Sequence, residues 1–382
     1  MPLTLAVGAA LALGACGSSS STSSNTTTPS TAAASGSSSS TAPAGGGSTS
    51  VQTGNPAAPV TINETGSSLV APYLAVLAAP LHAKYPNVTL ASAAGGSGKG
   101  ITDALSGTTQ AGGTDAYLSN AQASQNPSFE NIPVAVSSQS VDYNLPGVTG
   151  LKLTGGVLAD VYTGKVTTWN DPEIAKLNPG VNLPATKIVP VHRSDSSGDT
   201  FLFTGYLTKT SPAWASGPNM NTTVSWPQVN GALTANGNPN MVQTCKSTPG
   251  CVAYVGISAQ NLANQAGLGQ AQLQNAAGQF LVPGPQTVTA AVQAGASSVP
   301  DNLAASLIDE PGAQSYPIVN LEYLVVNTKQ SSPDMALALR DLFTFAIDPN
   351  GGASAALLQP EGFEAVPTQI VGKIDAALAK IQ

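Results

Sequence analysis

The sequence is organised around Arg193-Ser194-Asp195-Ser196-Ser197-Gly198-Asp199-Thr200, which leads directly into the apolar residues 201–207. Ser196 and Ser197 are of the residue type that caps helix N-termini, and Gly198 lets a ligand approach the backbone closely. We therefore predict a loop that runs into the N-terminus of a helix. The first N–H groups of a helix have no intrahelical partner, so such an end can bind an anion.

Arg193 precedes this predicted helix and adds a second anion-binding group. Its planar guanidinium can contact two oxygens of a tetrahedral oxyanion, and Asp195 is close enough in sequence to hold the guanidinium in place. For this stretch alone, an ordinary capped helix with a surface ion pair is an equally good explanation.

The composition separates a linker from the part of the chain that can fold. Residues 17–57 are almost entirely Ser, Thr, Gly, Ala and Pro, which predicts a disordered tether. The rest of the 382 residues is long enough for two domains with substantial cores. Only 9% of the residues are charged and the net charge is −7, so the chain lacks the basic stripe that nucleic acid requires. A small anionic ligand is still compatible, because local dipoles outweigh a weak, screened net charge.

The N-terminus has the features of an export signal. Residues 3–12 are an apolar run too short to span a bilayer, and Leu13-Gly14-Ala15-Cys16 follows. Small residues before a cysteine at this point resemble the lipobox of bacterial lipoproteins. Residues 1–16 would then be a lipoprotein signal peptide, and cleavage would leave Cys16 as the lipidated first residue. An ordinary secretory signal with an incidental cysteine is the alternative.

The two remaining cysteines, Cys245 and Cys251, flank a segment that contains Pro249-Gly250. This dipeptide predicts a tight turn that brings the two cysteines together. Export favours a disulfide between them, and two buried free thiols are the alternative. The spacing differs from C-x-x-C and no His lies nearby, so we expect no zinc site.

Two further Gly/Ser turns precede predicted helices. In the first, a strand at residues 60–63 is followed by a helix at residues 71–85, with Ser68 and the Leu69 N–H at the helix entrance. Pro80 is expected to kink or divide this helix.

The second turn follows a strand at residues 88–92 and contains Gly95-Gly96-Ser97-Gly98-Lys99-Gly100. Its glycines are similar to those of a phosphate-binding P-loop. However, Gly100 stands where Ser or Thr must hold magnesium, and the glycine spacing is wrong. We therefore predict a third helix N-terminus, with Ser97 as a hydroxyl donor.

Asp115 follows a short strand-like segment, so its carboxylate is expected at a strand end near the same cleft. A carboxylate beside an anion site requires an anion with a proton to donate, and phosphate carries one at neutral pH whereas sulfate does not. A buried acceptor that faces another acceptor costs on the order of a few kcal/mol, which is enough for large discrimination. Taken alone, Asp115 fits a solvated turn residue at least as well.

In this order and context, the motifs resemble the PstS family, the phosphate-binding proteins that serve the high-affinity phosphate ABC transporter. The resemblance extends from about residue 58 to the C-terminus. It rests on residues 193–200 together with Gly66-Ser67-Ser68-Leu69, Gly96-Ser97-Gly98, Thr114-Asp115-Ala116-Tyr117-Leu118-Ser119, residues 161–171, residues 174–180, Ala253-Tyr254-Val255-Gly256 and Gly362-Phe363-Glu364-Ala365-Val366-Pro367.

The resemblance implies an α/β protein with a two-lobe periplasmic-binding-protein fold of type II, crossover hinge strands, and a ligand cleft between the lobes. It implies that hydroxyls, backbone N–H groups and a guanidinium donate to phosphate, while one carboxylate accepts the phosphate proton. Asp115 is this acceptor, and Asp195 supports the guanidinium of Arg193. The phosphate-binding residues implied in this way are Ser68, Leu69, Ser97, Asp115, Arg193, Ser197, Gly198 and Asp199.

Asp199 departs from the family pattern, because some relatives have Thr at this position. Its N–H can still donate, while its carboxylate either turns away as a helix N-terminal acid or acts as a second acceptor. An inward carboxylate predicts a stronger preference for the singly charged, doubly protonated phosphate.

Two predicted crossovers, near Ser138 and near residues 316–319, define the lobes. Lobe I then combines residues 58–138 with residues 318–382, and lobe II comprises residues 139–317.

These features favour a lipoprotein at the extracytoplasmic face of the bacterial cell membrane that captures inorganic phosphate. It would close by hinge motion and deliver the ion to the permease subunits of an ABC importer. We expect a monomer that is not an enzyme, with no cofactor, no metal and no nucleic-acid partner. Sulfate or another tetrahedral oxyanion is one alternative ligand. Two other functions stay open: a secreted phosphoester hydrolase, with Ser196 or Ser197 beside His192 but without a G-x-S-x-G elbow, and a purely structural surface protein.

Overall fold

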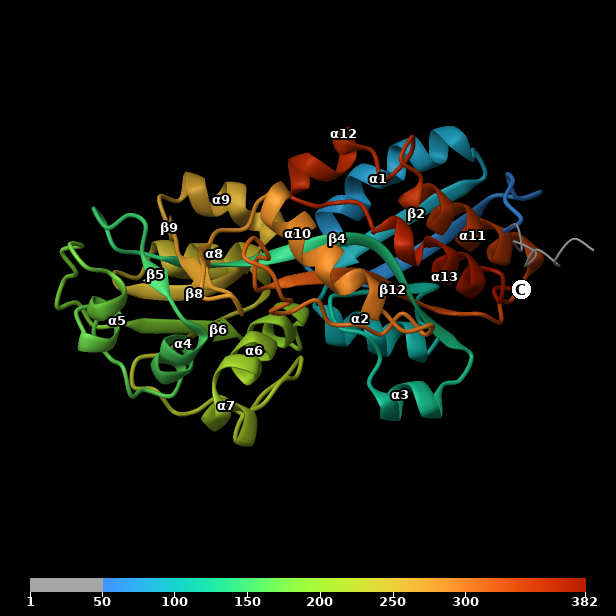
Figure 1. Cartoon of the computed structure of the whole chain (residues 1–382). Coiled ribbons are helices and arrows are strands. Elements are labelled where there is room, and N and C mark those ends of the chain that lie inside the picture. The colour runs from blue at the N-terminus through green and yellow to red at the C-terminus, as the bar shows by residue number, and fades with distance from the viewer. Residues whose placement is uncertain (1–50) are drawn as a thin grey trace, which may run out of the picture. The chain divides into compact units, whose positions relative to one another are not determined.

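The computed structural model describes residues 51–382 (Figure 1). The predicted signal peptide, the lipidation of Cys16 and residues 17–50 of the predicted tether lie outside the described residues. The prediction places the end of the tether at residue 57, but its last residues contact the fold. The N–H of Gly54 donates to Asp341 Oδ1 (2.8 Å), and the N–H of Ala57 donates to Asp334 Oδ1 (2.9 Å).

The described residues form an α/β structure around a mixed sheet with the strand order β2-β1-β3-β12-β4-β8-β6-β7, and β9 pairs with β4 beside this path. β1, β2 and β3 are parallel to one another, β12 is antiparallel to both β3 and β4, and β6 is parallel to β7 and β8. The strands of this sheet are β1 (Val60–Gly66), β2 (Val88–Ala94), β3 (Ala111–Thr114), β4 (Phe129–Tyr143), β6 (Val189–Arg193), β7 (Leu233–Ala235), β8 (Cys251–Gly256), β9 (Gly269–Gln270) and β12 (Val319–Asn327). A small second sheet contains β5 (Lys152–Leu153), β10 (Gln272–Gln274) and β11 (Phe280–Leu281).

The long strand β4 connects the two halves of the main sheet (Figure 1). It pairs with β12 as far as Ser138 and with β8 from Gln139 onward. Both faces of β4 are covered, because every residue from Asn131 to Tyr143 is buried. A polar side chain on this strand therefore needs a partner inside the protein.

Helices cover both halves of the sheet. α1 contacts β2, α2 contacts β1 and β3, α11 and α13 contact β4, and α6 and α8 contact β8. The α-helices are α1 (Ala71–Lys84), α2 (Ser97–Leu105), α3 (Asn120–Gln125), α4 (Gly155–Tyr162), α5 (Pro172–Leu177), α6 (Gly198–Thr210), α7 (Pro212–Ser216), α8 (Gly237–Lys246), α9 (Gln260–Gln265), α10 (Pro285–Gly295), α11 (Pro333–Ile347), α12 (Ala355–Leu358) and α13 (Thr368–Leu378). Three short 3₁₀ turns complete the described elements: η1 (Ile257–Ala259), η2 (Ala296–Ser298) and η3 (Gln359–Glu361).

α1 differs from the prediction at Pro80, since the proline does not divide the helix. A proline inside a helix removes one hydrogen bond and costs about 3 kcal/mol. Leu74 and Leu77 before the proline and Leu81 after it are all fully buried. Burial of these leucines on both sides of Pro80 holds the helix together across it.

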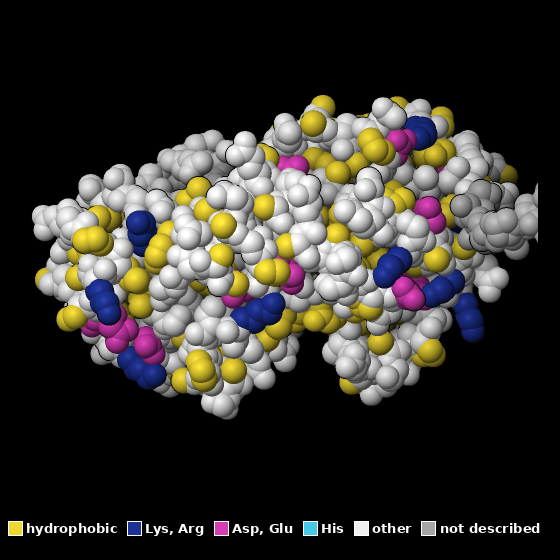
Figure 2. All heavy atoms as spheres, viewed as in Figure 1, with side chains coloured by type: hydrophobic (Ala, Val, Ile, Leu, Met, Phe, Trp, Pro, Cys, Tyr) yellow, Lys and Arg dark blue, Asp and Glu magenta, His cyan; other side chains and the backbone are white. Residues whose placement is uncertain are grey.

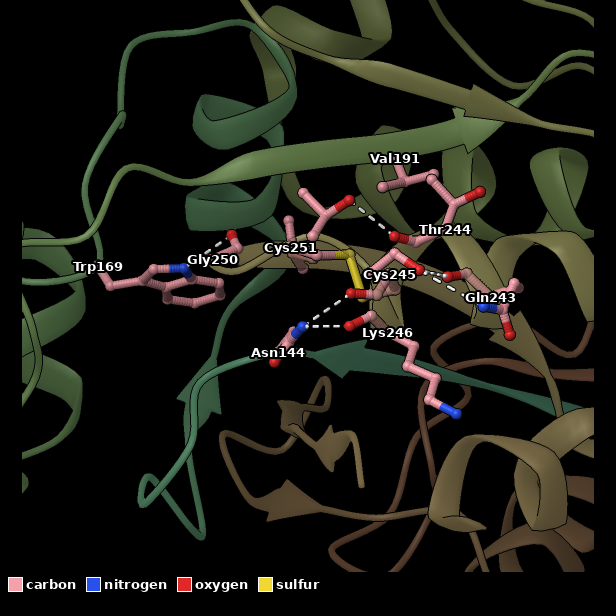
Figure 3. Close-up of a disulfide and its surroundings, with 12 residues drawn as sticks. Asn144, Trp169, Val191, Gln243, Thr244, Cys245, Lys246, Gly250 and Cys251 are labelled. Atoms are coloured by element: carbon pink, nitrogen blue, oxygen red, sulfur yellow. Dashed lines mark hydrogen bonds between the residues drawn. A yellow bond between two sulfur atoms is a disulfide. The ribbon is translucent and has the colours of Figure 1, made fainter. Parts of the chain in front are cut away.

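Cys245 and Cys251 form the expected disulfide, and the alternative of two free thiols is wrong (Figure 3). The bond joins the C-terminal end of α8 to the first residue of β8, with the two Cα atoms 5.2 Å apart. Asn144 Nδ2 donates to the carbonyl oxygens of Cys245 and Lys246 (2.9 Å each), so the loop is also held to the end of β4. The disulfide thereby fixes α8, whose N-terminus reaches the site described below.

Charged side chains are sparse and scattered on the face that Figure 2 displays. Most of the visible surface is backbone and uncharged side chains, which agrees with the low content of charged residues. Within residues 51–382, every helix is too short or too polar to cross a membrane.

Candidate functional site

The N-terminus of α6 is the centre of the site, as the sequence predicts. Ser197 is the N-cap residue, and its Oγ accepts a hydrogen bond from the Thr200 N–H (3.4 Å). The helix starts at Gly198, so its first N–H groups have no acceptor within the helix. Tyr254 on β8 orients the helix: its hydroxyl accepts the Arg193 N–H (2.8 Å) and hydrogen-bonds Thr200 Oγ1 (2.8 Å).

Arg193 is the last residue of β6, and its guanidinium is buried between two carboxylates. Nε donates to Asp195 Oδ1 (2.7 Å), Nη2 donates to Asp195 Oδ2, and Nη1 donates to Asp199 Oδ2 (2.8 Å). Burial lowers the pKa of Arg193, but the hydrogen bonds to Asp195 and the charges of Asp199 and Asp195 raise it overall. These bonds use three of the five N–H groups of a guanidinium, so the remaining ones can donate to a ligand.

Asp199 points into the protein, and its carboxylate is held by three donors. Oδ2 accepts from Arg193 Nη1 and from Asn238 Nδ2 (2.8 Å each), and Oδ1 accepts from Gln139 Nε2 (3.0 Å). Burial raises the pKa of Asp199, and the charge of Arg193 lowers it. The carboxylate thus points into the protein, where protein donors engage both of its oxygens. That it acts as a second acceptor beside phosphate stays a prediction.

Asp115 lies directly after β3 and is buried against the start of α6. A Cβ atom on Gly198 would lie 2.1 Å from Asp115 Oδ2, so only glycine allows this approach. Neither carboxylate oxygen of Asp115 receives a well-formed hydrogen bond from residues 51–382, although the nearby Ser67 side chain lowers the pKa of Asp115. Burial first and the charge of Asp199 second raise the pKa of Asp115 to about 6. A buried, unpartnered acceptor of this kind is suited to a guest that brings its own proton.

The glycines around Ser97 bring α2 against the stretch 193–200. Ser97 Oγ accepts the Asp115 N–H (3.2 Å), which leaves the hydroxyl proton of Ser97 free to be donated. The N–H of Gly98 donates to the Ser196 carbonyl (3.0 Å). A Cβ on Gly96 would lie 2.7 Å from Asp195 Oδ2, and a Cβ on Gly98 would lie 2.0 Å from Ser196 Oγ. These glycines therefore serve close packing of two chain segments.

The turn before α1 provides Ser68 and Leu69. Ser68 Oγ accepts the N–H of Asn238 at the start of α8 (3.3 Å). The N–H of Leu69, expected to donate to a ligand, instead donates to Ser67 Oγ (2.9 Å). Three helix entrances, those of α1, α2 and α6, thus meet at one place.

Comparisons with known proteins identify the family of this chain. Residues 22–350 match the family model of a PBP superfamily domain. The phosphate-binding protein PstS of Methanocaldococcus jannaschii is 36% identical over 283 residues, covering 69% of this chain and 72% of the relative. The phosphate-binding protein PstS of Pasteurella multocida is 32% identical, covering 74% of this chain and 79% of the relative. The chain belongs to the PstS family of phosphate-binding proteins.

A solved structure agrees with this PstS assignment at the level of the fold. The phosphate-binding protein from Stenotrophomonas maltophilia matches with a TM-score of 0.64 and 20% identity, covering 84% of this chain and 93% of that one. The predicted two-lobe α/β fold is confirmed.

Three polar residues of this PstS chain are missing from the sequence prediction of the site. Asn238 donates to Asp199 and also accepts the Gly256 N–H through its Oδ1 (3.0 Å). Gln139 and Glu322 lie on the buried strands β4 and β12. A long polar side chain inside an apolar strand needs a buried partner. On β12 the signal available was the polarity of Glu322 among apolar neighbours, whereas Gln139 and Asn238 lie in polar segments that give none.

His192 occupies a different environment from the one a hydrolase would need. Its ring stacks on Trp226 with the ring centroids 4.5 Å apart, and its Nδ1 lies 3.2 Å from the Arg193 carbonyl oxygen. Burial lowers the pKa of His192. The contacts of Ser197 Oγ are those of a helix cap rather than those of a nucleophile held by a base.

Proposed function

We propose that this PstS-family chain captures inorganic phosphate and delivers it to the permease subunits of an ABC importer. The names of its relatives in Methanocaldococcus jannaschii and Pasteurella multocida support this function, since both are phosphate-binding proteins. The chain would act as a monomeric binding protein without enzymatic activity.

The phosphate would lie where the three helix entrances meet. Ser68, Ser97 and Ser197 would donate their hydroxyl protons, and the first N–H groups of α6 at Gly198 and Asp199 would donate to other phosphate oxygens. Arg193 would donate its remaining guanidinium N–H groups, with Asp195 holding it in place. Leu69 would contribute its N–H only after releasing Ser67 Oγ.

The observation that carries this proposal is the Asp115 carboxylate. It is buried, receives no well-formed hydrogen bond from residues 51–382, and lies at the N-terminus of α6. Phosphate can donate a proton to it, whereas fully ionised sulfate would place an acceptor against an acceptor. The cost of such a contact is about 1–3 kcal/mol or more, which makes Asp115 the group that would select phosphate.

The lobes proposed from the sequence are residues 58–138 with 318–382, and residues 139–317. Two features support these boundaries. β4 exchanges its partner β12 for β8 between Ser138 and Gln139, and β12 begins at Val319. The two crossovers would act as the hinge that opens and closes the site.

We propose further that Cys16 is lipidated and holds the protein at the extracytoplasmic face of the cell membrane. The support is the sequence Leu13-Gly14-Ala15-Cys16. Mass spectrometry of protein extracted from membranes is expected to find an acylated Cys16 at the N-terminus. A chain that begins with an unmodified residue would refute the anchor.

Titration calorimetry of ligand-stripped protein tests the phosphate proposal. Phosphate is expected to bind on the order of 100-fold more tightly than sulfate, and Asp115→Asn should narrow this ratio because an amide can donate to sulfate. Equal binding of the two ions by the wild-type protein would contradict the proposal. Turnover of p-nitrophenyl phosphate that is abolished by Ser197→Ala would favour the hydrolase instead.

A further inference from the structure

A second carboxyl group lies beside Asp115. Glu322 is on β12, which pairs antiparallel with β3 so that Tyr323 faces Thr114. Continuing this register by one residue places Glu322 opposite Asp115. The two carboxyl groups are within hydrogen-bonding distance of each other, and both residues are buried.

The oxygens of Glu322 have different surroundings. Oε1 accepts hydrogen bonds from Ser137 Oγ and from Asn320 Nδ2 (3.3 Å). Oε2 has no donor among the residues that the structure describes, and the same is true of both Asp115 oxygens. Two carboxylates that face each other with no donor between them repel strongly, so one proton must lie between them. Oε2 of Glu322 is the oxygen left to carry it.

Asn320 fixes the relative position of the pair. Its Nδ2 donates to the Asp115 carbonyl oxygen (2.6 Å) as well as to Glu322 Oε1. The two acids therefore share a hydrogen-bonded support and cannot move apart independently.

We propose that Glu322 is a positioning residue for phosphate recognition: it stays protonated and donates to Asp115, which keeps Asp115 ionised as the acceptor of the phosphate proton. This inference rests on the proposed phosphate site. It explains how the Asp115 carboxylate can stay charged in a buried position with little other hydrogen-bond support.

The charges around the pair agree with this assignment of the proton. Burial raises the pKa of Glu322 well above its usual range, and the charge of Asp115 raises it further. The pKa of Asp115, raised by burial and by Asp199, is lowered by the hydrogen bond to Glu322 and, to a lesser extent, by the Ser67 side chain and by Arg193. The other ionisable neighbour of Glu322 is Tyr323, which follows it on β12 and whose pKa is raised. Glu322 is therefore the acid that keeps the proton near neutral pH.

Two substitutions separate this role from simple packing. Glu322→Gln keeps an acceptor for Ser137 and Asn320 and supplies an N–H to Asp115, so it imitates protonated Glu322. Glu322→Leu removes the donor, which raises the pKa of Asp115 and lets a protonated Asp115 donate to ions that carry no proton. Sulfate should then bind better relative to phosphate, and increasingly so as the pH falls.

The test is calorimetric titration of ligand-stripped wild type, Glu322→Gln and Glu322→Leu with phosphate and with sulfate, from about pH 5.5 to 8.5. Glu322→Gln is expected to keep the wild-type phosphate-to-sulfate ratio and its pH profile. Glu322→Leu is expected to lower the ratio on the order of tenfold or more, which corresponds to at least one pKa unit at Asp115. The proposal would be overturned if Glu322→Leu kept the wild-type ratio of phosphate to sulfate affinity, or if Glu322→Gln lost the preference for phosphate.

Two controls complete the design. If the proposed phosphate site is correct, Asp115→Asn must lose its preference for phosphate over sulfate. An unchanged phosphate-to-sulfate affinity ratio in Asp115→Asn would therefore mean that the site is wrong, rather than that the role of Glu322 is wrong. If Glu322→Leu does not fold, infrared difference spectra between wild type and Glu322→Gln decide the matter. The C=O band of a protonated carboxylic acid must be present at pH 7 in the wild type and absent from Glu322→Gln, and its absence from the wild type would refute the proposal.

Discussion

At the scale of single residues, the candidate site is dominated by three carboxyl groups around one guanidinium. Arg193 is bound by Asp195 and Asp199, and Asp115 lies at the start of the same helix. The carboxylates outnumber the cation, which is unusual for an anion site. Backbone N–H groups at the helix entrance, together with the proton on the guest, would make binding of an anion favourable at the proposed site.

Asp199 is expected to influence which protonation state of phosphate binds. Its inward carboxylate adds a negative charge beside Asp115, so it disfavours the dianion more than the monoanion. Asp199→Thr should therefore weaken the preference for the singly charged ion. The ratio of phosphate affinities at pH 5 and pH 8, a range that spans the second ionisation of inorganic phosphate at about pH 7, should fall by on the order of tenfold.

Asp171→Thr is the matched control for Asp199→Thr. Asp171 caps α5, and Thr can also cap, so the variant removes the same charge outside the phosphate site. Its pH profile should overlay that of the wild type. A profile of Asp199→Thr that also overlays the wild type would contradict the role of Asp199.

At the scale of secondary-structure elements, β1 contains a buried acid that should make stability depend on pH. Glu64 accepts the Gly113 N–H (2.9 Å) and a hydrogen bond from Ser92, and burial raises its pKa to about 7. The folded protein thus keeps this proton to higher pH than the unfolded chain does. Stability from this group is present below about pH 4.5 and is lost as the pH rises through about 7.

Glu64→Gln is expected to remove this part of the pH dependence. Between pH 5 and pH 8 the wild type should lose about 3 kcal/mol more free energy of unfolding than the variant, as measured by urea unfolding. Glu173→Gln, at an exposed position on α5, serves as the control. If the free energy of unfolding fell equally in wild type and Glu64→Gln between pH 5 and pH 8, Glu64 would not hold a proton in the folded state.

The contact between α6 and Asp115 depends on the absence of a side chain at Gly198. A Cβ there would lie 2.1 Å from Asp115 Oδ2, so Gly198→Ala must displace either the carboxylate or the helix. Overpacking of this kind costs about 1–3 kcal/mol, and phosphate affinity should fall roughly 10–100-fold in calorimetric titrations.

Gly372→Ala provides the comparison for Gly198→Ala. Gly372 lies within α13, and a Cβ there would have no atom within 4 Å. This variant should be more stable by up to about 1 kcal/mol with unchanged phosphate affinity. An affinity of Gly198→Ala equal to that of Gly372→Ala would rule out the close approach of Asp115 to α6.

The elements with local signals were the ones that the sequence could predict. The capped start of α6, the turn around Ser97 and the loop between the cysteines each depend on neighbouring residues. The hydrogen-bond partners of Asp199 could not be predicted from neighbouring residues, because Asn238 is 39 positions away in the sequence and Gln139 is 60 positions away. The undivided α1 at Pro80 likewise depends on leucine packing that propensity alone does not describe.

At the scale of the whole molecule, β4 and β12 link the two halves that provide the site. Ser68, Ser97 and Asp115 come from the part of the chain before β4, and Arg193 and α6 come from the part after it. Contacts across this division include polar ones, such as those of Asn238 with Ser68 and of Gly98 with Ser196, and an edge-to-face contact between the rings of Tyr117 and Phe201. A ligand that bridges both sides would therefore stabilise the assembled protein.

Phosphate is accordingly expected to raise the unfolding temperature of ligand-stripped protein. At about 1,000 times its dissociation constant, the added stability is about 4 kcal/mol, which gives a shift of several degrees in a calorimetric scan. Sulfate at the same concentration would be at about ten times its own dissociation constant, so it should add only about 1.4 kcal/mol and give a clearly smaller shift. Equal shifts by both ions would indicate a nonspecific salt effect.

The most direct measurement is a crystal structure of the protein with phosphate bound near neutral pH. The account predicts one phosphate ion in contact with Arg193, Ser97 and the first N–H groups of α6, with an Asp115 oxygen within hydrogen-bonding distance of a phosphate oxygen. A phosphate bound elsewhere, or one that Asp115 does not touch, would contradict it.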